Sequence, residues 1–203
     1  SPIGGVAVDA AGSGGIGGVA IEYEDLREWV ALAEKLGETR VINGASWEEQ
    51  IGMAADLVMH SDAAPCLIFD QVPGCKKGFR VLVNFFGGKR KNMTLGFPLS
   101  YNRLALSQAF LEEYLRNRPL VHYQEVSDGP IFENVLLGDD VDVTRFPTPW
   151  WHKHDGGRYI GTGSFNVTRD PDEKWVNVGT YRVMLHDRDS VGFYISPGKH
   201  GRI

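Results

Sequence analysis

The chain has 203 residues, of which 42% are apolar and 23% charged, a composition that supports a packed core and argues against disorder. Its formal charge of -5 argues against nucleic acid as the main partner, because phosphate binding needs a basic face. The two cysteines, Cys66 and Cys75, form no CxxC pair, so neither a disulfide scaffold nor a cysteine zinc site is expected. No apolar run approaches the roughly 18 residues of a membrane span and the start has no signal-peptide pattern, which predicts a soluble cytoplasmic protein.

Residues 1–24 are predicted to form a glycine-rich leader, either a flexible segment or an arm that lies on the surface. Gly12–Gly17 matches the GxGxxG pattern of dinucleotide sites. That fingerprint needs a helix to open within the turn, however, and Gly17-Gly18 resists helix formation. We therefore do not expect a nucleotide site here.

Residues 25–118 are predicted to form a mixed domain of helices and strands. Apolar residues at helical spacing predict a helix that begins near Asp25 and ends at Gly37. Ser46 and Glu49 have the spacing of a capping box, which predicts a second helix that runs to about His60. The remaining expected elements are strands at 40–43, 66–69 and 79–85 and a helix at 101–117.

Residues 119–203 have a different pattern, with no convincing helix and frequent Gly, Pro and Asp residues. The predicted short strands are 123–126, 132–137, 159–168, 176–185 and 192–196, and residues 170–173 form a hairpin turn between two of them. Short strands of this kind predict a sheet that closes into a barrel. The fold class is therefore α+β, with the boundary near residues 119–122.

Two clusters of polar residues have a structural role as their first explanation. The basic residues Lys76, Lys77, Arg80, Lys89, Arg90 and Lys91 are expected mainly as solvated ends of a hairpin, with an anion site as the alternative. His152, His154 and Asp155 offer metal-ligand chemistry, but Asp155-Gly156-Gly157 is a turn signal that favours a structural role.

Two later segments are candidate ligand sites. Strict alternation along a strand places Asn177 and Arg182 on opposite faces, and a bend at Gly179 would bring them to one side. The turn Ser196–Arg202 carries several hydrogen-bond donors and two cations, which suits a phosphate group.

Together, the order and spacing of six segments resemble the front portion of a UbiD-type decarboxylase. These segments are Asp25–Arg27, Ala64–Asp70, Arg80–Gly87, Gly138–Pro147, Asp155–Gly163 and Asn177–Arg182. The resemblance implies an N-terminal α+β domain at residues 25–118 and the first strands of a split β-barrel, related to flavin reductases, at 119–203. It also implies a (de)carboxylase that uses prenylated flavin mononucleotide (prFMN) on an aromatic, heteroaromatic or α,β-unsaturated acid.

The resemblance assigns roles to particular residues. Asn177 and His200 match ligands of a Mn²⁺ ion that holds the cofactor phosphate, and the backbone carbonyl of Trp175 matches a ligand of a nearby K⁺ ion. Arg182 matches the active-site arginine that positions the substrate carboxylate. The cofactor-binding set is then Asn177, Val178, Gly179, Thr180, Tyr181, Arg182, Lys199 and His200.

The metal-binding and proton-donating glutamates of the family have no matching position in residues 1–203. We therefore expect the remainder of the protein, or a companion chain, to supply them, and a homo-oligomer is expected from the resemblance. The alternative is a truncated module that binds a flavin phosphate or another subunit without catalysis.

Overall fold

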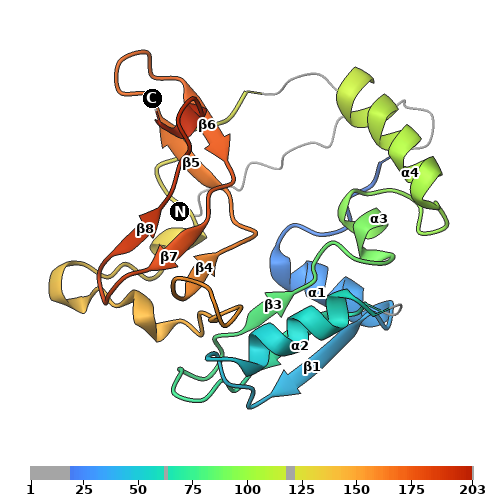
Figure 1. Cartoon of the computed structure of the whole chain (residues 1–203). Coiled ribbons are helices and arrows are strands. Elements are labelled where there is room, and N and C mark those ends of the chain that lie inside the picture. The colour runs from blue at the N-terminus through green and yellow to red at the C-terminus, as the bar shows by residue number, and fades with distance from the viewer. Residues whose placement is uncertain (1–18, 62–63, 118–121, 203) are drawn as a thin grey trace, which may run out of the picture.

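The computed structural model describes residues 19–61, 64–117 and 122–202, and it confirms an α+β chain. Two lobes are visible, one with all the α-helices and the other built mainly of short strands and loops (Figure 1). The glycine-rich sequence Gly12–Gly17 and most of the predicted boundary lie outside the described residues. The described part of the leader lies on the first lobe, where the Ala20 amide donates to the Gly96 carbonyl at 3.0 Å.

The first lobe combines a three-stranded sheet with four α-helices. Its elements are α1 (Leu26–Lys35), β1 (Thr39–Asn43), α2 (Gln50–Met59), β2 (Cys66–Asp70), β3 (Val81–Val83), α3 (Arg90–Thr94) and α4 (Arg103–Phe110), which the π-helical η1 (Leu111–Asn117) continues. Strand β2 is central, parallel to β1 and antiparallel to β3. The predicted helices and strands of this lobe are thus confirmed, although β3 is shorter than residues 79–85.

The start of α2 differs from the predicted capping box. The Ser46 hydroxyl accepts the Glu48 amide at 3.1 Å, and the side chain of Gln50, not that of Glu49, accepts the Ser46 amide at 2.8 Å. The helix begins at Gln50 because residues 47–49 form a turn first. Reciprocal bonding is therefore retained with shifted partners. The hydroxyl accepts an amide one residue earlier, and the returning side chain comes one residue later, than a capping box predicts.

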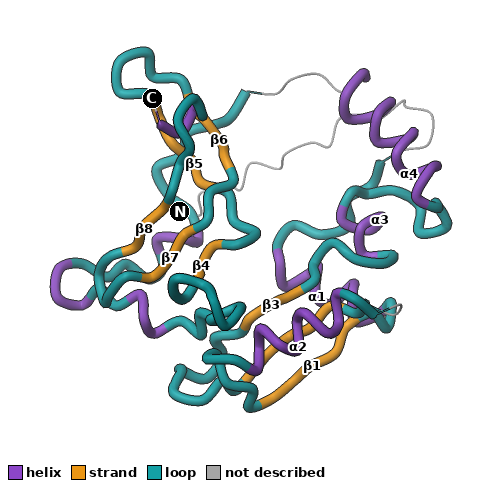
Figure 2. Tube along the Cα trace, viewed as in Figure 1, coloured by secondary structure: helices purple, strands orange, loops and turns teal. Residues whose placement is uncertain are grey.

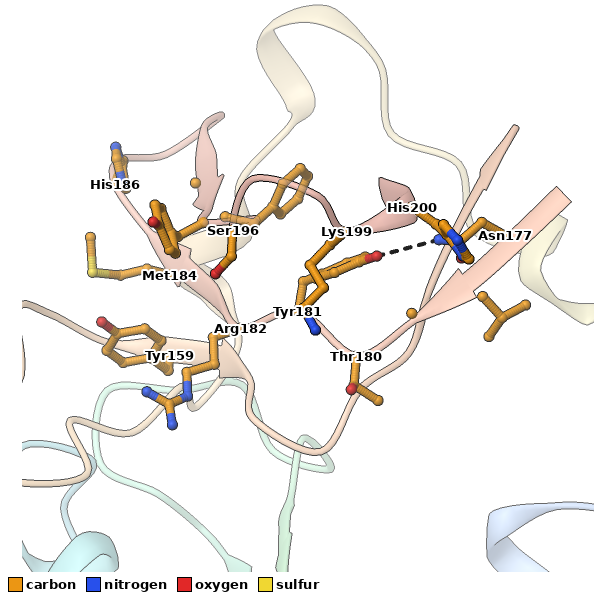
Figure 3. A pocket seen from close by; sticks show the side chains of 15 residues that line it. Tyr159, Asn177, Thr180, Tyr181, Arg182, Met184, His186, Ser196, Lys199 and His200 are labelled. Atoms are coloured by element: carbon orange, nitrogen blue, oxygen red, sulfur yellow. Dashed lines mark hydrogen bonds between the residues drawn. The ribbon is translucent and has the colours of Figure 1, made fainter. Parts of the chain in front are cut away.

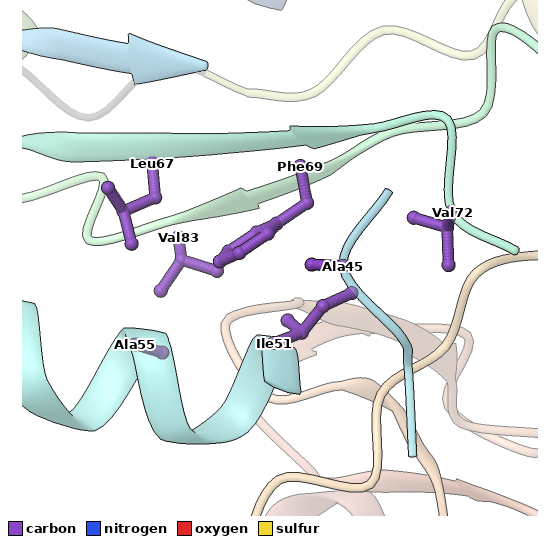
Figure 4. Packing of buried hydrophobic residues seen from close by; sticks show 7 residues of the cluster. All are labelled: Ala45, Ile51, Ala55, Leu67, Phe69, Val72 and Val83. Atoms are coloured by element: carbon purple, nitrogen blue, oxygen red, sulfur yellow. The ribbon is translucent and has the colours of Figure 1, made fainter. Parts of the chain in front are cut away.

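The main core lies between α2 and the sheet (Figure 4). Its members are buried apolar side chains from strands β2 and β3, from α2 and from the adjoining loops: Ala45, Ile51, Ala55, Leu67, Phe69, Val72 and Val83. A second cluster joins Trp29 and Ala33 of α1 to Cys66 on the opposite face of β2. Strand β2 is therefore buried on both faces, which explains its continuous apolar sequence.

The basic cluster contains a buried member, so its reading as hairpin ends is wrong for Arg90. This side chain is fully buried in the short helix α3, which the sequence pattern did not predict. Its guanidinium pairs with Glu38 at 2.8 Å and also donates to the carbonyls of Ala64 and Asn84. A buried guanidinium needs such partners, and here it ties α3 to the loops around the sheet.

The second lobe consists of two small antiparallel sheets. Its strands are β4 (Tyr159–Gly161), β5 (Asn166–Arg169), β6 (Val176–Gly179), β7 (Val183–Leu185) and β8 (Val191–Phe193). Strands β4, β7 and β8 form one sheet in that order, and β5 pairs with β6 in the other. Four 3₁₀ turns complete the lobe: η2 (Pro130–Phe132), η3 (Gly138–Asp140), η4 (Val143–Arg145) and η5 (His200–Arg202).

Several strands predicted for this lobe are shorter than expected or missing. Residues 123–126 and 132–137 form no strand, and loops surround the short strands in this part of the chain (Figure 2). The predicted strand 159–168 divides into β4 and β5 because residues 162–165 are not in a strand, and β4 then pairs with β7 whereas β5 pairs with β6. The predicted strand 176–185 divides at the bend that follows Gly179. The hairpin turn at 170–173 is confirmed, and the Asp170 carboxylate accepts two of its amides.

The lobes meet at the segment around Trp151. The Trp150 amide donates to the Trp47 carbonyl at 2.9 Å, and the Trp151 ring packs against the main core. The Trp151 indole donates to the carbonyl of Tyr159, the first residue of β4. This contact fixes the start of the second lobe's sheet on the core of the first. Across the described residues, no helix has the length and apolar character that crossing a membrane would require.

Candidate functional site

A pocket of about 790 Å³ lies in the second lobe, where the bend between β6 and β7 faces the turn before η5. All eight residues of the predicted cofactor-binding set line it: Asn177, Val178, Gly179, Thr180, Tyr181, Arg182, Lys199 and His200. The two segments lie near each other because η5 packs beside β6. The bend after Gly179 brings Asn177 and Arg182 to one pocket, which strict alternation would have prevented.

The two ends of this pocket carry different polar side chains. The Tyr181 ring points toward Asn177 and His200, whereas the Arg182 guanidinium extends toward Tyr159 (Figure 3). Arg182 is exposed and takes part in no ion pair among the residues of the described ranges. A free guanidinium at one end and an amide with an imidazole at the other can hold two different polar groups.

The Asn177 side chain has a fixed orientation. Its Nδ2 donates to the Thr168 hydroxyl at 3.2 Å and to the Tyr181 hydroxyl at 3.4 Å. In the part of the chain that the structure describes, no donor contacts its Oδ1. The carbonyl oxygen, the better metal ligand of the amide, is therefore the atom left for a ligand.

The His200 side chain, which lines the pocket, packs against the ring of Trp175. Their rings pack edge to face, with centroids 5.6 Å apart and an interplanar angle of 81°. Trp175 itself does not line the pocket. Its carbonyl accepts the Asp170 amide at 2.9 Å, which leaves a second lone pair of that oxygen for another partner.

The other pocket wall comes from the β4–β7–β8 sheet. Seven lining residues lie outside the predicted set: Tyr159, Met184, His186, Gly192, Phe193, Tyr194 and Ser196. Tyr159 pairs with Met184, and Met184 pairs with Gly192, so these positions share one face of the sheet. Alternation along β7 places Arg182, Met184 and His186 on that face, a signal that the sequence carries but that is readable only once the strand is known.

The other candidate clusters do not join the pocket. His152 and Asp155 approach to 3.5 Å within a turn, as the turn signal favoured, and His154 does not complete a ligand set. Over residues 19–61, 64–117 and 122–202, no group of three His, Cys, Asp or Glu side chains could hold a metal ion. The basic residues around β3 lie in the first lobe and line no part of the pocket.

Comparison with known sequences decides the family. The N-terminal domain of the 3-octaprenyl-4-hydroxybenzoate carboxy-lyases matches residues 30–107, and the Rift-related domain of the same enzymes matches residues 123–203. The chain belongs to the UbiD family. The segments that carried the resemblance in the sequence fall largely within these two matches.

Relatives of this UbiD-family chain include named decarboxylases. It is 34% identical over 149 residues to the pyrrole-2-carboxylic acid decarboxylase of Pseudomonas aeruginosa, a match that covers 68% of this chain and 29% of that protein. The chain thus spans about a third of the length of such relatives.

Solved structures of UbiD-class enzymes have the same fold. The vanillic acid decarboxylase of Sedimentibacter hydroxybenzoicus (ShVdcCD), in the open form with truncated ShVdcD, is 27% identical with a TM-score of 0.72, covering 84% of this chain and 37% of that one. The UbiD-class enzyme HmfF of Pelotomaculum thermopropionicum, in complex with FMN, is 25% identical with a TM-score of 0.65, covering 85% and 37%. The UbiD-family chain therefore corresponds in fold to one part of these longer proteins.

Proposed function

We propose that this chain is part of a prFMN-dependent (de)carboxylase that acts on an aromatic, heteroaromatic or α,β-unsaturated carboxylic acid. The observation that carries the proposal is one pocket that has the Arg182 guanidinium at one end and the Asn177 and His200 side chains at the other. The named activities of the pyrrole-2-carboxylic acid and vanillic acid decarboxylases support it, as does the FMN bound to HmfF.

The Asn177 end of the pocket would hold the cofactor phosphate through a metal ion. The free Oδ1 of Asn177 and the imidazole of His200 are donors that suit Mn²⁺. The ammonium group of Lys199 adds a positive charge for the phosphate. The remaining lone pair of the Trp175 carbonyl suits K⁺, and these donors therefore fit part of the expected shell.

Arg182 would hold the carboxylate of the substrate. A guanidinium pairs with a carboxylate through two parallel hydrogen bonds and stays charged at any working pH. The rings of Tyr159, Phe193 and Tyr194 lie along the same pocket and can cover an aromatic substrate. When bound, prFMN would supply the electron sink for loss of CO₂.

The fifteen residues that line the pocket include no Asp or Glu. In our proposal the third metal ligand and the proton donor are glutamates of the remaining protein or of a companion chain, in an assembly that is a homo-oligomer. The truncated ShVdcD component of the vanillic acid decarboxylase structure supports a companion chain. The lack of an Asp or Glu among the lining residues also favours a second candidate, a non-catalytic module that binds a flavin phosphate or another subunit.

Arg182→Ala in the full-length, prFMN-loaded protein tests the proposal. Release of CO₂ from pyrrole-2-carboxylate, vanillate and other aromatic acids should fall by about 10²-fold or more, with the flavin absorbance retained. Arg182→Lys should restore only part of the rate, because an ammonium cannot form the two parallel bonds.

Arg169→Ala is the matched control, since it removes an exposed arginine of β5 outside the pocket. Normal turnover by Arg182→Ala would contradict the assignment of Arg182. Flavin binding by the wild type without turnover of any acid would favour the non-catalytic module. Asn177→Ala should lower the Mn²⁺ content of the purified protein, and an unchanged content would count against Asn177 as a ligand.

A further inference from the structure

The Tyr181 side chain connects two segments that are distant in sequence. Its hydroxyl oxygen accepts the backbone N–H of Gly201 at 3.0 Å and the Nδ2 of Asn177 at 3.4 Å. Gly201 belongs to η5, and Asn177 belongs to β6. One phenol oxygen therefore joins the strand to the turn that carries His200 (Figure 3).

Two glycines give the Tyr181 ring the space to reach this position. A Cβ atom at Gly179 would lie 2.5 Å from the Tyr181 ring carbon Cζ, and one at Gly201 would lie 2.5 Å from the Tyr181 hydroxyl. Neither glycine has a left-handed backbone conformation, so conformational freedom does not require a glycine at either position. A side chain at either position would displace the Tyr181 ring, because the ring passes directly over the backbone.

The hydroxyl also contacts the Asn177 amide on its Nδ2 side. Tyr181 and Thr168 together provide two oxygen acceptors for Nδ2, which directs Oδ1 away from both. On the other segment, Gly201 follows His200 directly, so the bond to the Gly201 amide also fixes the place of His200. The two candidate metal ligands are thus held by one side chain that is not itself a ligand.

We propose that Tyr181 is a positioning residue, a clasp that sets the relative placement of Asn177 and His200 for metal binding. This inference rests on the proposed function for the metal, but the clasp itself is independent of any ligand. Partners that orient metal ligands typically contribute 10–100-fold to metal affinity. A ring that only filled space would contribute packing but would not depend on its hydroxyl.

Tyr181→Phe separates these two roles, because it keeps the ring over both glycines and removes only the hydroxyl. In the full-length protein, we expect the dissociation constant for Mn²⁺, measured by electron paramagnetic resonance of the free ion, to rise about 10-fold. In the metal-free protein, hydrogen–deuterium exchange of residues 198–202 should become faster, because the Gly201 amide loses its acceptor. Tyr123→Phe, outside the pocket, is the control and should change neither quantity.

A second variant, Thr168→Val, tests the orientation of Asn177 separately from the bond to Gly201. It removes the other acceptor of the Asn177 amide, so it should weaken Mn²⁺ binding while exchange at 198–202 stays as in the wild type. Unchanged exchange in Tyr181→Phe would overturn the clasp, whatever the metal affinity. Faster exchange with unchanged Mn²⁺ affinity would overturn the positioning role. If exchange is faster in Tyr181→Phe but the wild-type protein itself binds no Mn²⁺, the clasp is supported and the metal site of the proposed function is overturned.

Discussion

The guanidinium of Arg158 lies 3.8 Å above the ring of Trp47, and this contact joins the two lobes. Arg158 also donates to the carbonyls of Thr148 and Phe146, so its planar group is held on its edge as well as on its face. The next residue is Tyr159, which begins β4 and lines the pocket. The sheet that forms one pocket wall is therefore anchored directly to the first lobe.

Arg158→Ala should destabilise the protein by about 2 kcal/mol, because a desolvated cation–π contact and two hydrogen bonds are lost. Thermal and urea unfolding of the full-length protein measure this. Arg116→Ala is the control, since Arg116 forms an exposed ion pair with Glu112 that should contribute no more than about 0.5 kcal/mol. Equal losses in the two variants would show that Arg158 does not anchor the lobes.

Glu38→Gln should destabilise the protein strongly, although glutamine has nearly the same shape as glutamate. It leaves the fully buried Arg90 guanidinium without a counter-charge, which typically costs about 3–5 kcal/mol. The double variant Glu38→Gln/Arg90→Met should lose less than the sum of the two single variants, because the unpaired charge is then absent. A purely additive result in urea unfolding would contradict a buried ion pair, and Glu112→Gln at the exposed pair serves as control.

The thiol of Cys66 should make stability depend on alkaline pH. Burial raises the pKa of Cys66 from 9.0 to about 11, and the charge of Arg90 opposes this only in part. Below pH 9 the thiol is protonated in both states. Between about pH 9 and 11 the unfolded chain loses the proton first, so the stability that Cys66 contributes declines across this window.

The unfolding free energy of wild type and Cys66→Ala, measured from pH 8 to 11, isolates this effect. The difference between the two curves should be constant below pH 9 and should shrink toward pH 11. Curves that stay parallel over the whole range would rule out a raised pKa for Cys66. A thiol reagent at pH 8 should react with Cys66 only after unfolding, since its side chain is fully buried.

Much of the first lobe is predictable because its signals are local. The Asp25 carboxylate accepts the amides of Arg27 and Glu28 at the start of α1, and Gly37 follows the helix in a left-handed conformation. Arg90 is different, since a run of basic residues normally lies in solvent. Its burial depends on Glu38, which is 52 residues away, and the sequence does not show that pairing.

The residues that line the pocket likewise include some that the sequence predicts and some that it does not. Asn177, Arg182 and His200 stood out through their motifs, and the structure brings them to one pocket. Met184 and His186 carry no motif, and their place depends on the register of β7 against β4 and β8. Strand register is set by long-range pairing, so these two lining residues could be found only from the structure.

Gly52 tests the contact between α2 and the second lobe, because two effects of opposite sign compete there. Replacing a glycine inside a helix with alanine normally stabilises the helix by about 1 kcal/mol. At Gly52, however, an added Cβ would lie 2.0 Å from the backbone oxygen of Trp151. A backbone carbonyl cannot move aside as a flexible side chain can, so the steric clash should dominate.

We therefore expect Gly52→Ala to destabilise the protein by about 1–3 kcal/mol and to loosen the segment around Trp151. Thermal unfolding gives the first quantity, and hydrogen–deuterium exchange of residues 147–152 gives the second. Met53→Ala, on the exposed face of the same helix, is the control and should change stability by about 0.5 kcal/mol or less. A gain in stability for Gly52→Ala would mean that helix propensity dominates and that Trp151 does not rest on α2, since the clash requires that close approach.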